Sequence, residues 1–250
     1  MTNLFSIEGK VVVVTGGGRG IGRTIAQAMA EHQAITYCLD IRFDQDVPPE
    51  LTRYMFHIEC DITDEDSVRR ACSEIYDRHQ RSDVLVNNAG ITRPSEPESY
   101  PLGSWEETLA VNLTGAFVCS RVVAEYMKKG GGGSIINITS LNAEIAFPNN
   151  PAYIASKGGL KMLGKSLALD WGEYGIRVNN IGPGYIRTEM TGKSYENEGL
   201  RKEREARTML GRWGTPEDLI GLCIFLASDA SSYITGQDIY VDGGWLSKGL

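Results

Sequence analysis

The chain has 250 residues, with 25 basic and 32 acidic side chains and a formal net charge of −7 at pH 7. Because acids and bases are mixed along the chain and no segment concentrates Lys and Arg, the sequence excludes a nucleic-acid surface. No apolar run approaches the ~18 residues of a membrane span, and residues 1–10 lack a signal-peptide core. We therefore expect a cytoplasmic protein that does not enter a membrane.

Short β-branched runs alternate with amphipathic stretches along the whole chain, which is typical of a parallel sheet covered by helices on both faces. The sequence therefore predicts an α/β fold, a doubly wound parallel sheet of the Rossmann type with about seven strands. A chain of this length fits a single domain over residues 1–250. The expected strands are residues 11–14, 35–39, 54–58, 84–86, 134–138, 177–181 and 238–241.

The first expected strand leads directly into a glycine cluster that runs from Thr15 to Gly22 and precedes a helix. Glycines let the backbone turn tightly, so that N–H groups and the positive end of the following helix can contact a pyrophosphate. The glycines at 16, 20 and 22 depart from the common GxGxxG spacing, and such a cluster alone could be an ordinary strand-to-helix turn. Its position before the next strand favours a phosphate site.

Asp40 ends the second expected strand, where a carboxylate can accept hydrogen bonds from the adenosine ribose and repel a 2′-phosphate. This position favours NAD over NADP as the cofactor. Arg19 and Arg42 argue mildly in the other direction, because either guanidinium could reach a 2′-phosphate.

Three segments between the strands carry further predictions. Residues 43–53 contain two prolines and are too short for a crossover helix, so we expect at most one helical turn. Residues 64–79 form an amphipathic helix, and Thr63 with Asp66 resembles a capping box at its start. Residues 129–134 (KGGGGS) resemble a flexible linker, but they are predicted to be a helix-to-strand connection with a glycine cap.

Neither the cysteines nor the histidines have the spacing of a metal site, and we predict that no metal is bound. The three histidines lack a partner motif, so none is assigned to catalysis. The five cysteines are scattered and flanked by apolar residues, which predicts reduced core thiols: Cys38, Cys60, Cys72, Cys119 and Cys223.

Tyr153 and Lys157 lie one helical turn apart, 13 and 17 residues after Ser140. A phenol has a reference pKa near ~10 and needs stabilisation of its anion to act as a base at neutral pH. Side chains at i and i+4 share a helix face, so the Lys157 ammonium can lie beside the Tyr153 ring. We expect this cation to lower the pKa of Tyr153 partly, and a cationic cofactor to supply the rest.

With these motifs, the chain resembles the short-chain dehydrogenase/reductase family over nearly all of its length. The resemblance rests on several ordered motifs: the glycine cluster, Asp61 in CDI, NNAG at 87–90, Asn112 in VNLTG, Ser140 in NITS, YIASK at 153–157, Pro183-Gly184 followed by Thr188, and the closing TGQDIYVDGG. Any one of these motifs is weak evidence, whereas their joint occurrence in order is specific.

The resemblance implies a catalytic quartet of Asn112, Ser140, Tyr153 and Lys157 in an NAD(P)-dependent alcohol dehydrogenase or ketoreductase. In such enzymes the tyrosine is the general acid/base, the lysine contacts the nicotinamide ribose, the serine contacts the reacting oxygen, and the asparagine anchors a water. The implied cofactor contacts are Gly16, Arg19, Gly20, Ile21, Asp40, Asp61, Ile62, Asn88, Ala89, Gly90, Tyr153, Lys157, Pro183, Gly184, Ile186 and Thr188. The family also implies a homotetramer.

The C-terminal segments at 211–219 and 225–233 and the ending VDGGWL most resemble dehydrogenases of gluconates, related sugar acids and polyols. The expected substrate is therefore a small polar alcohol or ketone. Arg93 could pair with a substrate carboxylate, although a surface role is equally compatible with its position. Residues near 185–210 are predicted to form a substrate lid. The candidate substrate contacts are Arg93, Ser140, Asn142, Asn150 and Tyr185.

Two other functions remain open at this stage. An NADPH-dependent 3-oxoacyl-thioester (acyl carrier protein) reductase would share the same quartet, and Asp40 argues against it because it would repel a 2′-phosphate. A cofactor-binding regulator or scaffold without catalysis is disfavoured because all four catalytic positions are filled.

Overall fold

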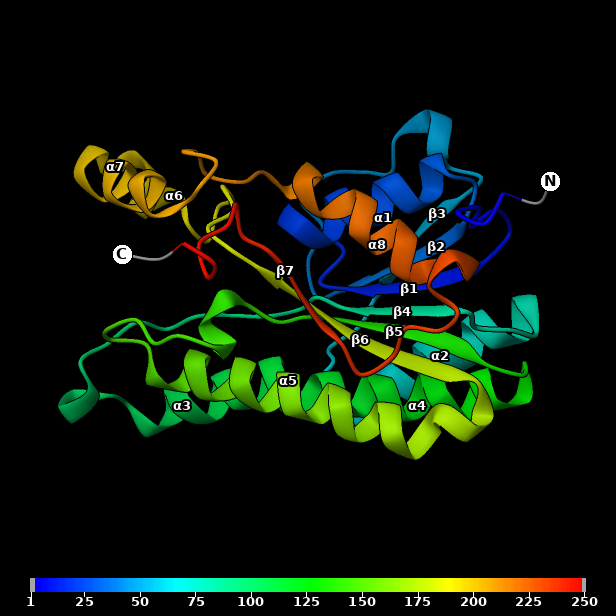
Figure 1. The fold of residues 1–250 in the computed structure, drawn as a ribbon. Coiled ribbons are helices and arrows are strands. Elements are labelled where there is room, and N and C mark those ends of the chain that lie inside the picture. The colour runs from blue at the N-terminus through cyan, green and yellow to red at the C-terminus, as the bar shows by residue number, and fades with distance from the viewer. Residues whose placement is uncertain (1–2, 249–250) are drawn as a thin grey trace.

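The computed structural model describes residues 3–248 and contains one parallel sheet of seven strands in the spatial order β3-β2-β1-β4-β5-β6-β7 (Figure 1). This confirms the predicted doubly wound α/β fold, and each predicted strand is present with ends displaced by at most two residues. From β1 to β3 the chain adds strands toward one side of the sheet, and from β4 to β7 it adds them toward the other side, so the strand order reverses between β1 and β4. The strands are β1 (Val11–Thr15), β2 (Ile35–Asp40), β3 (Met55–Glu59), β4 (Val84–Asn87), β5 (Gly133–Ile138), β6 (Ile176–Pro183) and β7 (Asp238–Val241).

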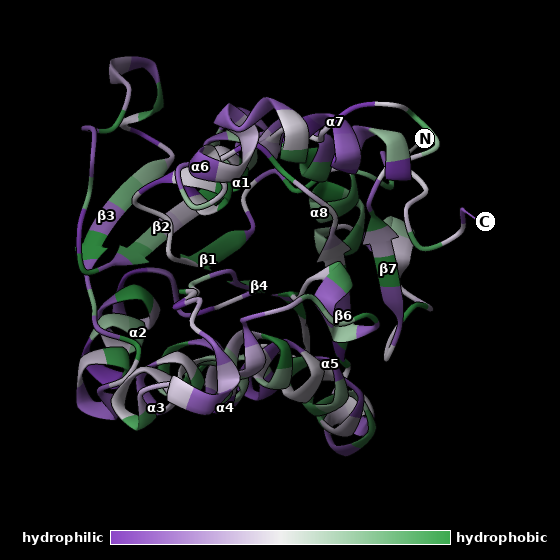
Figure 2. Ribbon diagram, turned by 90° about the vertical axis from the view of Figure 1, so that its left-hand side faces the viewer, coloured by the Kyte–Doolittle hydropathy of each residue, from purple (hydrophilic) through white to green (hydrophobic). Residues whose placement is uncertain are grey.

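Helices cover both faces of the sheet: α2, α3, α4 and α5 lie on one face, and α1 and α8 lie on the other (Figure 1). The short helices α6 and α7 stand apart, beyond the carboxyl ends of the strands (Figures 1 and 2). The helices are α1 (Gly20–Glu31), α2 (Glu65–His79), α3 (Leu102–Leu109), α4 (Ala116–Lys129), α5 (Pro151–Trp171), α6 (Gly192–Glu196), α7 (Glu198–Arg207) and α8 (Ile220–Ala227).

Two apolar cores result from the alternation of side chains along the strands. In β1, Val11 and Val13 pack into the core under α2 and α4, whereas Val12 and Val14 pack into the core with α1 and α8. All four side chains are buried. Because both faces of the sheet are covered, its central strands have continuous apolar sequences, which made them recognisable.

Three buried amides and one carboxylate form a chain of hydrogen bonds across four neighbouring strands at one level. Asn87 on β4 donates to Asn137 on β5 at 2.9 Å, and Asn137 donates to Asn180 on β6 at 2.9 Å. Asn180 in turn donates to Asp238 on β7 at 2.7 Å. These residues are direct partners in the strand register. These hydrogen bonds join the strands at this level and hold their relative positions, although the Asn87 Oδ1 is buried without a partner among the described residues.

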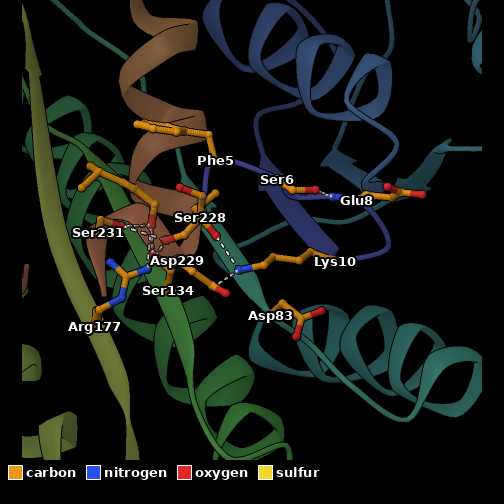
Figure 3. A network of polar contacts seen from close by, with 12 residues as sticks. Phe5, Ser6, Glu8, Lys10, Asp83, Ser134, Arg177, Ser228, Asp229 and Ser231 are labelled. Carbon is orange, nitrogen blue, oxygen red and sulfur yellow. Dashed lines mark hydrogen bonds and ion pairs between the residues drawn. The ribbon is translucent and has the colours of Figure 1, made fainter. Parts of the chain in front are cut away.

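The C-terminal end of α8 is fastened near the amino ends of the strands by two basic side chains (Figure 3). Lys10 donates to the Ala227 carbonyl at 3.0 Å and pairs with Asp229 at 2.9 Å. Arg177 donates to the Leu226 carbonyl at 2.8 Å. Cations that bond the last carbonyls of a helix stabilise its end. The predicted site residues lie at the opposite end of the sheet, where the strands have their carboxyl ends, which we call the carboxyl edge.

The connections agree with the sequence predictions. Residues 43–53 contain one short 3₁₀ segment, Pro49–Leu51. Helix α4 ends at Lys129 with Gly130 as its cap, and Gly131 and Gly132 take the positive φ values +85° and +137° before β5 begins. One local prediction, the capping box of Thr63 and Asp66 at the start of α2, was wrong. Asp64 is the N-cap of this helix, and its side chain accepts from the Asp66 N–H at 3.0 Å.

All five cysteines are free and buried, which confirms the prediction of core thiols. Burial raises the pKa of the Cys38, Cys72 and Cys223 thiols to about 12. Within residues 3–248, no helix is both long and apolar enough to cross a membrane.

Candidate active site

The glycine loop between β1 and α1 is packed so tightly that two of its positions require glycine. Gly16 has a φ of +64°, and Asn88 at the end of β4 donates to the Gly16 carbonyl at 3.1 Å. A Cβ on Gly22 would lie 2.1 Å from the Gly16 oxygen and 2.3 Å from Asn88 Nδ2. The loop and the end of β4 therefore form one compact unit, with the Ala89 backbone directly against Gly16.

The first turn of α1 is open to an external acceptor. Arg19 occupies the N-cap position in an extended conformation, and among the described residues no side chain caps this end of the helix. The N–H groups of Gly20, Ile21 and their neighbours lie at the positive end of the helix dipole. A glycine cradle that leaves no room for a Cβ, followed by an uncapped helix start, fits a dinucleotide pyrophosphate.

Asp40 lies beside this loop, as predicted from the sequence. Its Oδ2 accepts from the Gly18 N–H at 2.9 Å, and its Oδ1 accepts from the Arg42 N–H at 3.2 Å. The Arg42 guanidinium pairs with Asp44 at 2.7 Å and is well exposed. The structure thus fixes a carboxylate next to the glycine loop and directs the charge of Arg42 to a neighbouring acid.

The segment after β3 approaches the same edge. Asp61 accepts from the Thr63 N–H at 2.9 Å and from its hydroxyl at 2.7 Å, which shapes a tight turn. Ile62 is buried against Gly115, where a Cβ would lie 2.8 Å from the Ile62 side chain. The carboxyl ends of β1, β2, β3 and β4 therefore lie at the same end of the sheet, between the helices that cover its two faces (Figure 2).

Asn112 lies in a π-helical turn, Ala110–Gly115, between α3 and α4. Its side chain is fully buried and bonds both backbone groups of Ile91, accepting from the N–H at 2.8 Å and donating to the carbonyl at 2.9 Å. It also donates to the Ser156 hydroxyl at 3.0 Å. π-helical turns widen a helix locally and are frequent at functional sites. This turn fixes Asn112 between α5 and the segment after β4.

Lys157 is buried, with 4% of its surface exposed, and its Nζ donates to the Ile138 carbonyl at 2.7 Å. Gly90 brings these groups together, because a Cβ there would lie 3.4 Å from Asn112 Oδ1 and 3.6 Å from Lys157 Nζ. Burial lowers the pKa of the Lys157 ammonium from its usual 10.5 to about 8. The structure therefore holds a desolvated cation at the centre of the site.

Tyr153 lies one turn earlier on α5, and the Lys157 Nζ is 5.8 Å from the centre of its ring. Burial raises the pKa of Tyr153 above its ordinary value, a hydrogen bond with Ser140 opposes this, and the nearby Tyr185 phenol raises it further. We expected Lys157 to lower the pKa of Tyr153 partly and a cationic cofactor to supply the rest, but in the chain without cofactor the pKa of Tyr153 is raised. The ammonium is directed to the Ile138 carbonyl, so desolvation of the phenol dominates.

Ser140 follows β5 and begins a 3₁₀ turn, Leu141–Ala143. Its hydroxyl accepts from the Asn142 N–H at 3.1 Å and donates to the Asn142 side chain at 3.2 Å. Asn150 exchanges hydrogen bonds with Thr92, with distances of 2.8 and 3.1 Å. These contacts hold the two segments before α5 beside the catalytic candidates.

Arg93 extends away from this group. Its guanidinium forms a two-pronged contact with Glu107 at 3.0 and 3.2 Å, and about half of its side chain is exposed. The pairing of Arg93 with a substrate carboxylate stays a prediction, and in this structure an acid of the chain itself occupies the guanidinium fork.

The segment after β6 carries the remaining cofactor candidates. Pro183 ends β6, and a Cβ on Gly184 would lie 2.7 Å from the Asp242 backbone, so the chain passes closely over β7. Ile186 is buried and Thr188 bonds Thr191, which keeps these two positions at the carboxyl edge. A cavity of about 450 Å³ lies beside Thr188 and is bordered by α6 and by residues 215–217.

The sequence analysis missed an aromatic cluster over this edge, formed by Phe147, Tyr185, Trp213 and Trp245, with Tyr195 against Trp213. The ring centres of neighbouring members are 5.0 to 5.9 Å apart. Four segments separated by up to 98 residues supply these rings, so no local pattern in the sequence could have revealed them.

No group of three or more His, Cys, Asp or Glu side chains among residues 3–248 has the arrangement of a metal site. The four catalytic candidates at the carboxyl edge are instead one ammonium, one phenol, one hydroxyl and one carboxamide. With the glycine cradle and Asp40, they form a dinucleotide-type site joined to a proton-transfer site.

Comparison with known proteins agrees with a site of this kind, because the relatives are named as dehydrogenases and reductases. The sequence model of a family described as Enoyl-(Acyl carrier protein) reductase matches residues 16–246. Gluconate 5-dehydrogenase of Gluconobacter oxydans is 36% identical over 97% of this chain and 96% of its own length. D-threitol dehydrogenase of Mycolicibacterium smegmatis is 36% identical over 98% of this chain and 95% of its own length. The solved gluconate 5-dehydrogenase of Burkholderia cenocepacia, in complex with NADP and tartrate, has a TM-score of 0.91 and 36% identity, with 98% of both chains covered.

The chain therefore belongs to the short-chain dehydrogenase/reductase family. Its relatives are named as dehydrogenases and reductases of sugar acids and polyols. The protein is accordingly an oxidoreductase of polar CH–OH substrates, an alcohol dehydrogenase or ketoreductase that uses a nicotinamide cofactor.

Proposed function

We propose that the protein is an NAD-dependent oxidoreductase that interconverts a secondary alcohol and a ketone on a sugar acid or polyol, with Tyr153 as general acid/base. The observation that carries this proposal is the placement of Asn112 and Gly90 around the buried Lys157 ammonium, with Ser140 and Tyr153 nearby. When bound, the nicotinamide ring accepts the hydride in the oxidative direction.

In the proposed mechanism, the Ser140 hydroxyl donates a hydrogen bond to the reacting oxygen and orients the substrate, after exchanging its present contact with Asn142. Tyr153 removes the proton from the substrate hydroxyl in oxidation and returns it in reduction. A further positive charge brought by the oxidised cofactor opposes the burial that raises the pKa of Tyr153. Asn112 positions the Ile91 segment and α5 so that this group keeps its geometry.

Replacing Tyr153 with Phe tests this assignment, because it removes only the proton-transferring oxygen. We expect turnover of D-gluconate and D-threitol to fall by roughly three to four orders of magnitude, in the range of a lost general acid/base. Tyr174→Phe is the matched control, since Tyr174 is exposed and lies after the C-terminal end of α5. Full activity of the Tyr153 variant would refute the assignment.

Asp40 supports NAD as the cofactor, because a 2′-phosphate would meet a carboxylate that is fixed by two backbone N–H groups. A glycerol dehydrogenase of Listeria innocua that is 34% identical is named NAD-dependent, whereas the Burkholderia relative binds NADP. Initial rates with NAD⁺ and NADP⁺ at equal concentration distinguish the two. A higher kcat/KM with NADP⁺ would contradict this part of the proposal.

The description of the matching family names an acyl-carrier-protein thioester with an enoyl group, so the class of substrate to set against sugar acids and polyols is a thioester. The alternative function is the NADPH-dependent reduction of a 3-oxoacyl thioester. A panel of polyols, sugar acids and acetoacetyl thioesters separates the two functions. Turnover of the thioester without any turnover of gluconate or threitol would replace the proposed substrate class.

Further parts of the proposal concern the whole molecule. We propose that residues 1–250 act as one dinucleotide-binding domain and that residues 185–210 form a lid over the substrate. We also propose a cytoplasmic homotetramer in which α4 and α5 form contacts, supported by the exposed apolar side chains of Phe117, Met162 and Leu169. Light scattering coupled to size-exclusion chromatography measures the mass, and a monomer would contradict this assembly.

A further inference from the structure

Helix α7, in the proposed lid, places arginines over the aromatic cluster. The Arg204 guanidinium carbon lies 4.3 Å from the centre of the Tyr185 ring and 5.6 Å from the Trp213 ring. Arg207 lies 5.7 Å from the Trp245 ring. Stacking on aromatic faces orients a guanidinium while leaving the N–H groups at its edge free to bind an acceptor.

Arg204 differs from the other basic residues of α7 because no acidic side chain of this helix forms an ion pair with it. Arg201 pairs with Glu205, Lys202 with Glu198 and Arg207 with Glu203, each one helical turn apart. The residues one turn before and after Arg204 are Leu200 and Thr208, which carry no charge. Within residues 3–248, Arg204 forms no ion pair, and its Nη1 is buried without a hydrogen-bond partner.

A buried guanidinium nitrogen without a partner costs free energy unless an acceptor binds it in the functional state. Charge-assisted bonds from a guanidinium to a carboxylate are among the strongest hydrogen bonds in proteins and are commonly two-pronged. The Arg204 Nη1 therefore has a free donor that an oxygen of a carboxylate can satisfy.

Tyr185 connects Arg204 with the catalytic group. Its ring carries the Arg204 guanidinium and lies close enough to Tyr153 to influence the pKa of that phenol. Phe147, from the segment between Ser140 and Tyr153, contacts the same ring edge-on at 5.6 Å. Arg204 thus stacks on the ring of a tyrosine whose phenol acts on Tyr153, so the fold brings this cation from α7 toward the proposed reacting centre.

We propose that Arg204 binds the carboxylate of the substrate and thereby selects sugar acids over neutral polyols. This inference rests on the proposed function and narrows its substrate class. A sugar acid has a carboxylate at one end and its reacting hydroxyl several carbons away, so two separate contacts orient it. Arg93, the other candidate for this contact, already has Glu107 in its fork.

Arg204→Gln tests the inference with D-gluconate and the neutral D-threitol as substrates. We expect the KM for gluconate to rise roughly 10- to 100-fold, as for one lost charge-assisted contact, while kcat stays within about threefold. The KM for threitol should change by less than about twofold. Arg204→Lys retains the charge without the fork and should restore part of the gluconate affinity.

Arg207→Gln is the matched control, because it removes an arginine of the same helix that stacks on a ring but is paired with Glu203. A role of Arg204 in lid stability alone would raise both KM values together and lower the melting temperature. Equal effects on gluconate and threitol, or a selective loss of gluconate in Arg93→Gln in place of Arg204→Gln, would overturn the inference.

A binding measurement separates this inference from the proposed reaction. Trp213 lies beside Arg204, so D-gluconate should change the intrinsic fluorescence of the parent and of Tyr153→Phe, and not that of Arg204→Gln. Turnover of threitol without any turnover or binding of gluconate would leave the oxidoreductase function intact and refute the role of Arg204. Gluconate binding that needs Arg204, without turnover of any alcohol, would refute the reaction and support the contact.

Discussion

Replacing Lys157 with Met removes a buried cation, and the structure predicts how this changes stability with pH. In the folded chain, burial lowers the pKa of Lys157 from 10.5 to about 8. Each pKa unit corresponds to about 1.4 kcal/mol, so the charged ammonium destabilises the fold by about 3 kcal/mol near neutral pH. Because this side chain is only 4% exposed, solvent screening is small.

The direction follows from proton linkage. Lys157 binds its proton more weakly in the folded than in the unfolded chain, so the free energy of unfolding rises with pH between about 8 and 10.5. Between pH 7 and 9.5 the parent should gain about 2 kcal/mol from this group, and Lys157→Met should lack this gain. Loss of the hydrogen bond to the Ile138 carbonyl shifts the variant's curve as a whole and leaves its slope unaffected.

Urea unfolding at several pH values, without added nucleotide, measures the difference between the two curves. Lys165→Met is the matched control on the same helix, because Lys165 is partly exposed and its pairing with Asp238 raises its pKa. Its curve should run parallel to that of the parent up to pH 9.5. Parallel curves for the parent and Lys157→Met would refute the reasoning that a desolvated ammonium lies in this site. Lys157→Met should also lose turnover.

Three further substitutions test other parts of the site. Gly22→Ala places a Cβ 2.1 Å from the Gly16 oxygen, so the unfolding free energy should fall by about 1–3 kcal/mol and nucleotide affinity should drop in a fluorescence titration; unchanged affinity would argue against the cradle. Asp40→Ser should lower the NAD⁺ to NADP⁺ ratio of kcat/KM at least about tenfold in initial-rate assays, and a constant ratio would contradict its role. Hydrogen bonding to Arg212 lowers the pKa of Asp218 to about 2, so parent stability should fall from pH 4 to 2 in acid unfolding and fall less in Asp218→Asn.

The sequence by itself predicted the sheet, because strands that are buried on both faces have continuous apolar sequences. Continuous apolar runs such as residues 11–14 identify central strands, and their ends were placed within two residues. The glycine loop could also be recognised from the sequence, because the packing there requires glycine. A Cβ on Gly16 or Gly22 would clash with neighbouring backbone atoms and with the Asn88 side chain. Local rules failed at the start of α2, where Asp64 caps the helix in place of the predicted box.

The catalytic candidates were found in the sequence by their order along the chain, but their electrostatics were not. The spacing of Tyr153 and Lys157 suggested a direct charge effect along one helix face. In the folded chain, Lys157 donates to the Ile138 carbonyl from β5, and burial governs the pKa of both groups. Desolvation depends on everything that packs around a group, which no spacing in the sequence encodes.

The sequence alone therefore determined the family and the sheet and indicated the catalytic candidates, because these depend on local pattern and ordered motifs. Only the tertiary structure decided which groups are partners. It placed Asn112 and Lys157 around Gly90, aligned Asn87, Asn137 and Asn180 across three strands, and left the Nη1 of Arg204 without a partner beside Tyr185. The physical reason is that hydrogen bonds, stacking and burial join segments that lie tens of residues apart, and packing alone brings them together.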